Sequence, residues 1–202
     1  MEKIDCTGVI LAGGKNSRLP GKKKAFHQVG ETIILDKIYS LFSKLFSQVI
    51  LVVNDPKEFA SMDALVVTDI IPAGCALAGL HTGLFYSASP WIYATACDVP
   101  FISETVIQYL LSQRTSKKEI IIPRTREGLE PLSALYHKSC LPRMETNLSR
   151  QRFMIKKCFT PKKVLEVLPE TLETLDPKMR FKFNVNTPED LALARTMAGE
   201  SS

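Results

Sequence analysis

The sequence lacks the cysteine and histidine patterns that build metal centres and disulfide frameworks. Its five cysteines are odd in number and include no C-x-x-C pair, and its three histidines are scattered without ligand spacing. These absences argue against a zinc site and against a disulfide-stabilised fold. At 202 residues the chain is long enough to bury a core without either device.

Long apolar runs are also missing. No stretch approaches about 18 consecutive apolar residues, so we expect no membrane span and no membrane partner. Residues 1–5 include acids and no long apolar region, which gives no sign of a signal peptide and makes the cytoplasm the expected location. Internal repeats and low-complexity segments are absent too, and the length fits a single domain over residues 1–202.

Three common site signatures are absent from the sequence. No G-x-G-x-x-G follows the first predicted strand, which disfavours a nicotinamide-binding domain, and there is no G-x-x-x-x-G-K-[ST]. Ser17 has no G-x-S-x-G around it, so a nucleophilic serine is not expected.

The net charge of +5 is modest, and residues 15–24 alone hold five cations, which argues against a general nucleic-acid surface.

What the sequence does contain is an alternation of strand and helix patterns. Apolar, mostly β-branched runs predict buried strands, and amphipathic segments between them predict helices. The predicted strands are 7–12, 49–53, 64–68, 91–96, 119–122 and 132–136, and the predicted helices are 32–46, 76–87 and 103–113. Strands that are apolar on both faces and separated by helices indicate a three-layer α/β/α fold with a mostly parallel, twisted sheet.

The end of the chain has its own pattern of strand, turn and helix start within residues 183–191. Thr187 is the predicted N-cap of the last helix, Pro188 its first residue and Asp190 its third-position acid. Asn184 and Asn186 occupy alternate positions of the extended part, which places both amides on one face. Such a pair can hold a flat heterocycle or orient phosphates, and plain turn chemistry is the alternative.

The segment after the first predicted strand carries the strongest functional signal. The strand ends in Gly13-Gly14, and Arg18 and the lysines of residues 22–24 follow within ten residues. Glycines let backbone N–H groups turn toward a ligand, and successive N–H groups form an anion-binding concavity. The pattern favours a polyphosphate site, with an ordinary turn and a solvated basic loop as the alternative.

Polar residues also stand at or just after the ends of other predicted strands. Ligands of such sheets bind outside the carboxyl ends of the strands, so we expect Gly13-Gly14, Asn54, Asp69 and Asp98 to converge on one cleft. A lone carboxylate such as Asp98 can hold Mg²⁺ together with substrate phosphates, and capping of the next helix is the alternative. For Asp69 the alternative is a turn before Pro72.

Taken together, these motifs resemble those of the molybdenum cofactor guanylyltransferases, within the wider nucleotidyltransferase fold of nucleotide-sugar synthesising enzymes. The resemblance spans nearly the whole chain and rests on Leu11-Ala12-Gly13-Gly14, Arg18, Lys24, Asn54, Asp69 with Pro72, Leu77-Ala78-Gly79, Asp98-Val99-Pro100, Glu130-Pro131-Leu132, Ala134-Leu135-Tyr136 and residues 184–191. The first motif is shared with cytidylyl- and uridylyltransferases, whereas Asn184-Val185-Asn186-Thr187-Pro188 is more specific to the guanylyl branch.

The resemblance implies a Rossmann-like nucleotidyltransferase fold that transfers GMP from GTP to molybdopterin, with Mg²⁺, forming the guanine dinucleotide cofactor and pyrophosphate. Residues 1–127 would form the nucleotide-binding half and residues 128–202 the acceptor-binding half. Transient contact with the enzymes that accept the cofactor is expected, and contact with nucleic acid is not. The alternatives are a related enzyme that uses CTP or a sugar-phosphate acceptor, and a catalytically silent nucleotide-binding regulator.

The same resemblance implies individual residue roles. Nucleotide contacts are implied for Leu11, Ala12, Gly13, Gly14, Lys24, Asn54, Asp69 and Asp98. Catalytic roles are implied for Arg18, Lys24 and Asp98, with Asp98 as the Mg²⁺ ligand. Asn184 and Asn186 are implied to sit beside the molybdopterin.

Four residues depart from the family's pattern. Pro20 stands where the family has the first of two glycines, and Lys23 replaces an aspartate. Cys75 and Ala76 occupy the places of a Gly-Pro pair, so Cys75 is expected to need a negative φ or a strained one.

Two further cation assignments concern phosphate. Counting from Arg18 makes Lys24, rather than Lys22 or Lys23, the phosphate-binding lysine. Residues 138–163 contain eight Lys or Arg residues against one acid, Glu145. We expect some of Arg150, Arg152, Lys156 and Lys157 to face the acceptor's phosphate, and a solvated helical face is the alternative.

Overall fold

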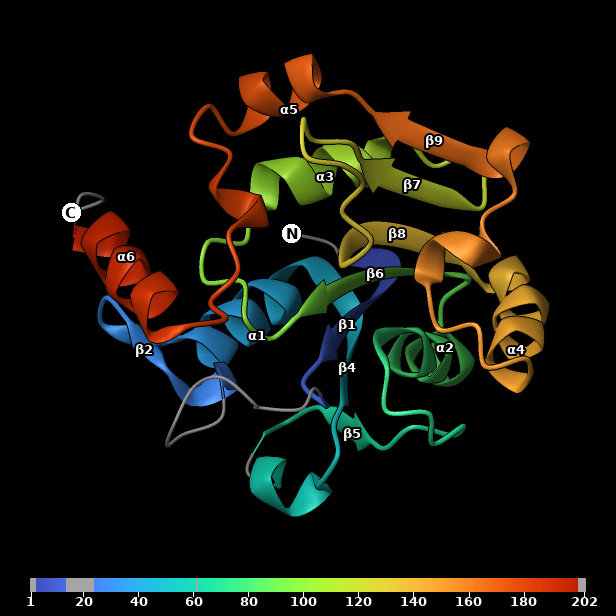
Figure 1. The fold of residues 1–202 in the computed structure, drawn as a ribbon, viewed down its shortest axis with the longest axis horizontal. Helices are drawn as coiled ribbons and strands as arrows, with labels where there is room; N and C mark the ends of the chain where they lie inside the picture. Colours follow the sequence, from blue (N-terminus) through green and yellow to red (C-terminus); the bar gives the residue numbers. More distant parts are fainter. Residues whose placement is uncertain (1–2, 14–23, 61, 200–202) are drawn as a thin grey trace.

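The computed structural model describes residues 3–13, 24–60 and 62–199. Within these residues the main sheet has seven strands in the order β5-β4-β1-β6-β8-β7-β9 (Figure 1). They are β1 (Ile4–Leu11), β4 (Phe46–Val52), β5 (Leu65–Val67), β6 (Trp91–Ala96), β7 (Ile120–Pro123), β8 (Ser133–His137) and β9 (Val164–Val167). β8 is antiparallel to its neighbours β6 and β7, and the other pairings are parallel. The predicted mostly parallel sheet is confirmed.

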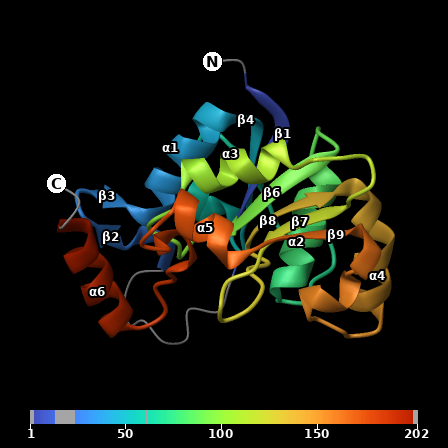
Figure 2. The ribbon, with the colours of Figure 1, turned by 90° about the horizontal axis from the view of Figure 1, so that it is seen from above.

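Helices cover both faces of this sheet. They are α1 (Ile34–Leu45), α2 (Ala76–Tyr86), α3 (Glu104–Ser112), α4 (Leu141–Ser149), α5 (Pro169–Leu175) and α6 (Pro188–Gly199). α1 and α3 lie on one face, and α2 and α4 lie on the other (Figure 2). Phe42 of α1 packs edge to face on Tyr93 in one core layer, and Leu84 of α2 shares the other layer with Ile92. The three-layer α/β/α architecture is therefore confirmed.

Short elements complete the described chain. A small hairpin is formed by β2 (Gln28–Val29) and β3 (Thr32–Ile33), and Arg195 of α6 donates from Nε to the carbonyl of Gln28 at 3.2 Å. The short 3-10 helices are η1 (Lys24–Phe26), η2 (Pro56–Phe59), η3 (Lys138–Cys140), η4 (Ile155–Cys158), η5 (Pro161–Lys163) and η6 (Arg180–Lys182). None of the described helices is both long enough and apolar enough to cross a lipid bilayer.

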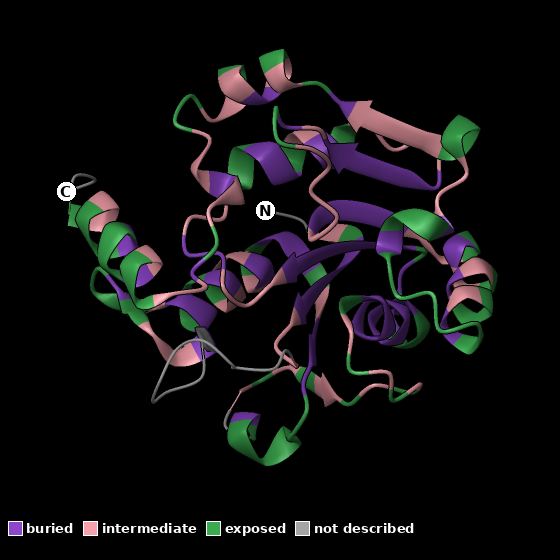
Figure 3. Ribbon diagram, in the orientation of Figure 1, coloured by how far each residue is buried: buried purple, intermediate pink, exposed green. Residues whose placement is uncertain are grey.

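α2 is the most deeply buried helix beside the site, and Figure 3 shows it almost wholly buried. Gly83 lets it approach β1 closely, because a Cβ added at Gly83 would lie 2.5 Å from Val9 Cγ1. Met144 of α4 shares the core layer of α2. The sheet and α4 together fix α2, and with it the residues that this helix presents at the sheet edge.

Side-chain caps begin two of the helices, and the one at Thr187 confirms the predicted N-cap. The Val106 N–H donates to Ser103 Oγ at 3.3 Å at the start of α3. At α6 the Asp190 N–H donates to Thr187 Oγ1 at 3.1 Å, and the Thr187 N–H donates back to Asp190 Oδ2 at 2.9 Å, which makes a capping box. The strand predicted at the start of residues 183–191 is wrong, because that segment pairs with no described strand of the sheet.

Candidate active site

The site is built where four parallel strands end. Backbone bonds continue the pairing just past the strands: the Ala12 N–H donates to the Val52 carbonyl at 2.8 Å, and the Cys97 N–H donates to the Leu11 carbonyl at 3.0 Å. The residues that follow β1, β4, β5 and β6 therefore share one edge of the sheet. These residues include Gly13, Asn54, Asp69 and Asp98.

Gly13 and Asn54 are in close contact at this edge. A Cβ added at Gly13 would lie 2.8 Å from Asn54 Oδ1, closer than real Cβ atoms come to another heavy atom. Any side chain at position 13 would displace the Asn54 amide. The glycine thus leaves room for Asn54 and keeps its own backbone open to a ligand.

Asp69 lies beside Leu11 and the first turn of α2. A Cβ added at Gly79 would lie 3.1 Å from Leu11 Cδ2 and 3.7 Å from Asp69 Oδ1. Asp69 is half-buried, and this burial raises the pKa of its carboxyl above the ordinary value, while nearby His81 opposes the rise. A half-buried carboxylate at this place can accept hydrogen bonds from a nucleobase.

A pocket of about 530 Å³ opens beside Asp98. Its polar wall includes Asp98, Glu130, Lys156, Lys182, Asn184 and Asn186. The N–H of buried Val185 donates to the Asp98 carbonyl at 2.9 Å, which ties the asparagine segment to the end of β6. Because Val185 points into the core, its two neighbours both face the pocket, and the predicted alternation of the amides is confirmed.

Glu130 brings a second carboxylate to this pocket. Burial raises the pKa of its carboxyl, and a hydrogen bond from Thr125 Oγ1 at 3.2 Å together with the charges of Lys182 and Lys156 limits the rise. Lys182 also forms an ion pair with Glu127. The wall therefore mixes carboxylates, amines and amides, a set that suits a polar ligand with phosphate groups.

The donors of this pocket fit a hydrated divalent cation. Mg²⁺ is usually held by one or two carboxylates, and it keeps waters and takes substrate phosphates as its remaining ligands. Asp98 and Glu130 supply carboxylates in that number. Over residues 3–13, 24–60 and 62–199 there is no group of three or more His, Cys, Asp or Glu side chains that could enclose a metal.

Several predicted site residues cannot be placed from the structure. Gly14, Arg18, Pro20 and Lys23 lie outside the described residues. Lys24 begins η1, and its side chain also lies outside the description. The roles given to these residues stay predictions.

Cys75 stands where the family has glycine, and it was expected to need a negative φ or a strained one. Cys75 has φ −136° and ψ 159°, an ordinary extended conformation, and it precedes α2 as its N-cap residue. The left-handed conformation falls on Gly74, with φ +59°, where glycine adopts it without a steric penalty. Cysteine is therefore accommodated at this position without backbone strain.

Some of the four basic residues Arg150, Arg152, Lys156 and Lys157 were expected to face the acceptor's phosphate, and one of them is at this pocket. Lys156 lines the pocket. Arg150, Arg152 and Lys157 are not among the described residues that line it. Lys182, Phe153 and Met154 line the pocket as well, although the sequence motifs did not predict them as site residues. Phe153 is 43 % exposed and Met154 63 %. Two large apolar residues inside a basic segment are the sequence feature that could have identified them as site residues.

The fold is that of a nucleotidyltransferase. The family described as "MobA-like NTP transferase domain" matches residues 8–164. Molybdenum cofactor guanylyltransferase from Desulfosudis oleivorans is 30% identical over 188 residues, which cover 93% of each chain. A probable molybdenum cofactor guanylyltransferase from Pelotomaculum thermopropionicum is 33% identical over 199 residues, 98% of this chain and 96% of its own.

A solved structure agrees with this assignment at the level of the fold. Molybdopterin-guanine dinucleotide biosynthesis protein A from Archaeoglobus fulgidus superimposes with a TM-score of 0.84 at 23% identity, covering 96% of this chain and 99% of that one. The present chain belongs to the molybdenum cofactor guanylyltransferase family. The resemblance inferred from its motifs is confirmed.

Proposed function

We propose that the protein transfers GMP from GTP to the terminal phosphate of molybdopterin and releases pyrophosphate. The observation that carries the proposal is the pocket in which Asp98 meets Asn184 and Asn186, in a chain whose relatives are named molybdenum cofactor guanylyltransferases. An acceptor phosphate oxygen attacks the α-phosphorus of GTP, the bond to the bridging oxygen breaks, and pyrophosphate leaves with that electron pair. The attacking oxygen is already ionised at neutral pH, so catalysis requires positioning and charge neutralisation rather than a strong base.

The nucleotide is proposed to lie along the carboxyl edge of the sheet, against Leu11, Ala12 and Gly13. The close contact of Gly13 with Asn54 excludes a side chain at position 13, which supports a backbone that stays accessible to the nucleotide. Asp69 has a carboxylate that accepts hydrogen bonds, which suits the N–H and amino groups of a guanine base. Gly14 and the cations after it would take the phosphates.

The acceptor is proposed to fill the pocket beside Asp98. Asn184 and Asn186 offer amides that donate and accept, as a flat polar heterocycle requires. Lys156 supplies positive charge for a phosphate, and exposed Phe153 supplies an apolar surface at the same pocket.

Asp98 is the residue proposed to hold Mg²⁺, together with phosphates of the substrate. The ion, when bound, neutralises charge that develops on the α-phosphate and on the leaving pyrophosphate. Arg18 and Lys24 would add fixed positive charge around the same phosphates. Asp98 itself is held at the end of β6 by its backbone bond from Val185.

The test is a pyrophosphate-release assay on the purified protein with molybdopterin, Mg²⁺ and each of the four nucleoside triphosphates in turn. We expect release with GTP, only when molybdopterin is present, and little with the other three. Faster release with CTP than with GTP would identify CTP, and not GTP, as the nucleotide substrate. Binding of GTP without release under any combination would instead identify a silent nucleotide-binding protein.

A further inference from the structure

A second pocket lies at the opposite edge of the sheet from the candidate active site. It has a volume of about 540 Å³ and is bordered by residues 114–119, the end of β8 and Lys163 just before β9. Trp91 lines it and begins β6, whereas Asp98 follows the end of that strand. A rise of about 3.3 Å per residue puts the two ends roughly 20 Å apart. A ligand here would not touch the proposed reacting groups.

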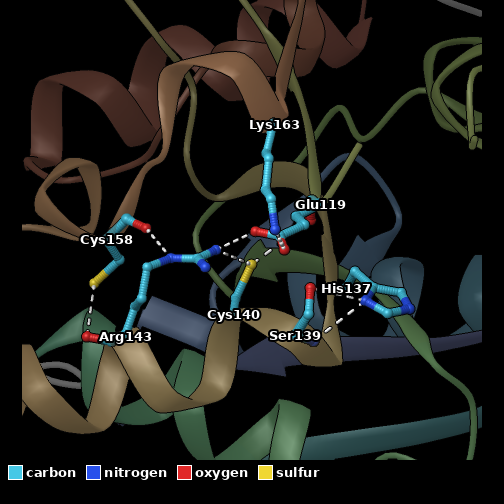
Figure 4. Close-up of polar contacts among 7 residues, drawn as sticks. All are labelled: Glu119, His137, Ser139, Cys140, Arg143, Cys158 and Lys163. Atoms are coloured by element: carbon cyan, nitrogen blue, oxygen red, sulfur yellow. Dashed lines mark hydrogen bonds and ion pairs between the residues drawn. The ribbon is translucent and has the colours of Figure 1, made fainter. Parts of the chain in front are cut away.

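The wall of this second pocket is rich in cations. Arg114, Lys117, Lys118 and Lys163 line it, and Glu119 is the one acid among the described residues that do so. Figure 4 shows that Glu119 is already engaged: Lys163 Nζ donates to its Oε1 at 2.6 Å, and Arg143 pairs with its other oxygen. Glu119 is shared between Lys163 and Arg143, so it does not balance the positive charges of the other lining residues, Arg114, Lys117 and Lys118.

Two of the cations are held in place by neutral groups. Arg114 donates to the backbone carbonyls of Leu111 at 3.0 Å and of Asp5 at 2.8 Å. Lys118 Nζ donates to the carbonyls of Lys162 at 3.2 Å and Val164 at 3.0 Å. Carbonyl partners fix the side chains without cancelling their charge. Each head group also keeps N–H donors beyond those used, because a guanidinium has five and an ammonium three.

His137 adds an imidazole to the same wall. Its Nδ1 accepts a hydrogen bond from the Ser139 N–H at 3.2 Å (Figure 4), which leaves Nε2 as the N–H donor of the ring. The ring packs against Trp91 with centroids 5.1 Å apart. The hydroxyls of Thr115 and Ser116 border the pocket as well.

We propose that this pocket binds a small oligophosphate, a ligand with several anionic oxygens on linked phosphates. Arg114 and Lys118, held by carbonyls in the wall of one concavity, match such a ligand, since an arginine fork binds two oxygens and lysines bind as point charges. The volume lies in the range of small-molecule pockets, which favours a compact anion over an acidic protein surface. The inference is independent of the proposed transfer reaction.

The experiment uses Trp91, which is the sole tryptophan of the chain and lines this pocket. The purified full chain is titrated with sodium tripolyphosphate at low ionic strength, without Mg²⁺, while tryptophan emission is recorded. Isothermal calorimetry on the same solutions detects binding that leaves the emission unchanged. We expect saturable binding that weakens as salt is added.

Variants assign the binding to the pocket. Lys117 is exposed, so Lys117→Glu should leave the fold intact and weaken tripolyphosphate binding about tenfold. Lys118→Gln removes a charge but keeps a donor for the backbone carbonyls, and it should weaken binding severalfold. The matched control is Lys178→Glu, an equal charge change at an exposed lysine that does not line this pocket, and it should change the affinity less than twofold.

Three results would overturn the proposal. The first is absence of saturable binding by both measurements. The second is an equal loss of affinity in Lys117→Glu and Lys178→Glu, which would reflect net charge alone. The third is binding of a short poly-glutamate peptide in preference to tripolyphosphate, which would make the surface a protein contact.

Discussion

Replacing Gly83 by alanine tests the packing that holds α2, and one wall of the site, against the sheet. An added Cβ would lie 2.5 Å from Val9 Cγ1 and 2.9 Å from Val9 Cγ2. Val9 is fully buried in β1, and its β-branched side chain has few alternative rotamers. The new methyl group can be accommodated only if α2 moves away from the sheet.

Two opposing effects set the size of the change at Gly83. Alanine is favoured over glycine within a helix by about 1 kcal/mol. Overpacking a core costs about 1–3 kcal/mol, and a contact roughly 1 Å shorter than van der Waals distance belongs in the upper part of that range. We therefore expect a net loss of about 1–2 kcal/mol in the free energy of unfolding, or a Tm lower by roughly 2–8 °C.

Urea unfolding followed by circular dichroism measures this loss. The matched control is Gly199→Ala at the end of α6, where an added Cβ meets nothing within 4 Å, and the change there should stay within about 0.5 kcal/mol. Movement of α2 also shifts Gly79 relative to Asp69, so the KM for GTP should rise in Gly83→Ala. A Gly83→Ala protein as stable as the parent, or more stable, would show that helix propensity decides and that the packing does not constrain α2.

Three other substitutions probe individual groups. Asp98→Asn should remain folded and lose nearly all turnover at saturating Mg²⁺. The control Asp63→Asn, at an exposed aspartate, should keep parental rates. An active Asp98→Asn variant would refute the assignment of Asp98 as the Mg²⁺ ligand. Lys24→Ala should weaken GTP binding more than Lys23→Ala in a thermal-shift titration, and the reverse order would move the role to Lys23. Burial of Glu119 would by itself raise its pKa, but hydrogen bonds from its cationic partners outweigh this and hold the pKa below the ordinary value. A lowered pKa gives stability that is fully present above the unfolded pKa of about 4.3 and is lost as the pH falls through the folded value. Glu119→Gln should therefore lower the free energy of unfolding by about 1–2 kcal/mol near neutral pH, a modest loss because Lys163 and Arg143 are partly exposed. The loss should be smaller below about pH 4. Urea unfolding that shows an equal loss at both pH values would contradict this.

Where the structure agrees with the sequence, the reason is a local pattern. Strands β1, β4 and β6 are apolar on both faces, and such runs identify buried parallel strands without knowledge of their partners. The capping box at Thr187 and Asp190 rests on spacing alone. The amides of Asn184 and Asn186 share a pocket because extended backbone alternates, even though the segment joins no described strand.

Where prediction failed, the deciding contacts were distant in sequence. β9 is a short edge strand whose residues are mostly half-buried, so it lacks the two-sided apolar pattern. Lys182 reaches the pocket only because η6 is placed there by the fold after α5. At Cys75 the sequence allowed a strained or an unstrained backbone, and the conformation of Gly74 decides between them.

Transfer of GMP to molybdopterin can be followed with GTP labelled at its α-phosphate. The purified protein is incubated with this GTP, molybdopterin and Mg²⁺, and the products are separated. We expect the label in a molybdopterin guanine dinucleotide, with one pyrophosphate released for each label transferred. Label recovered only as free GMP or GDP, or a dinucleotide formed from CTP in preference to GTP, would contradict it.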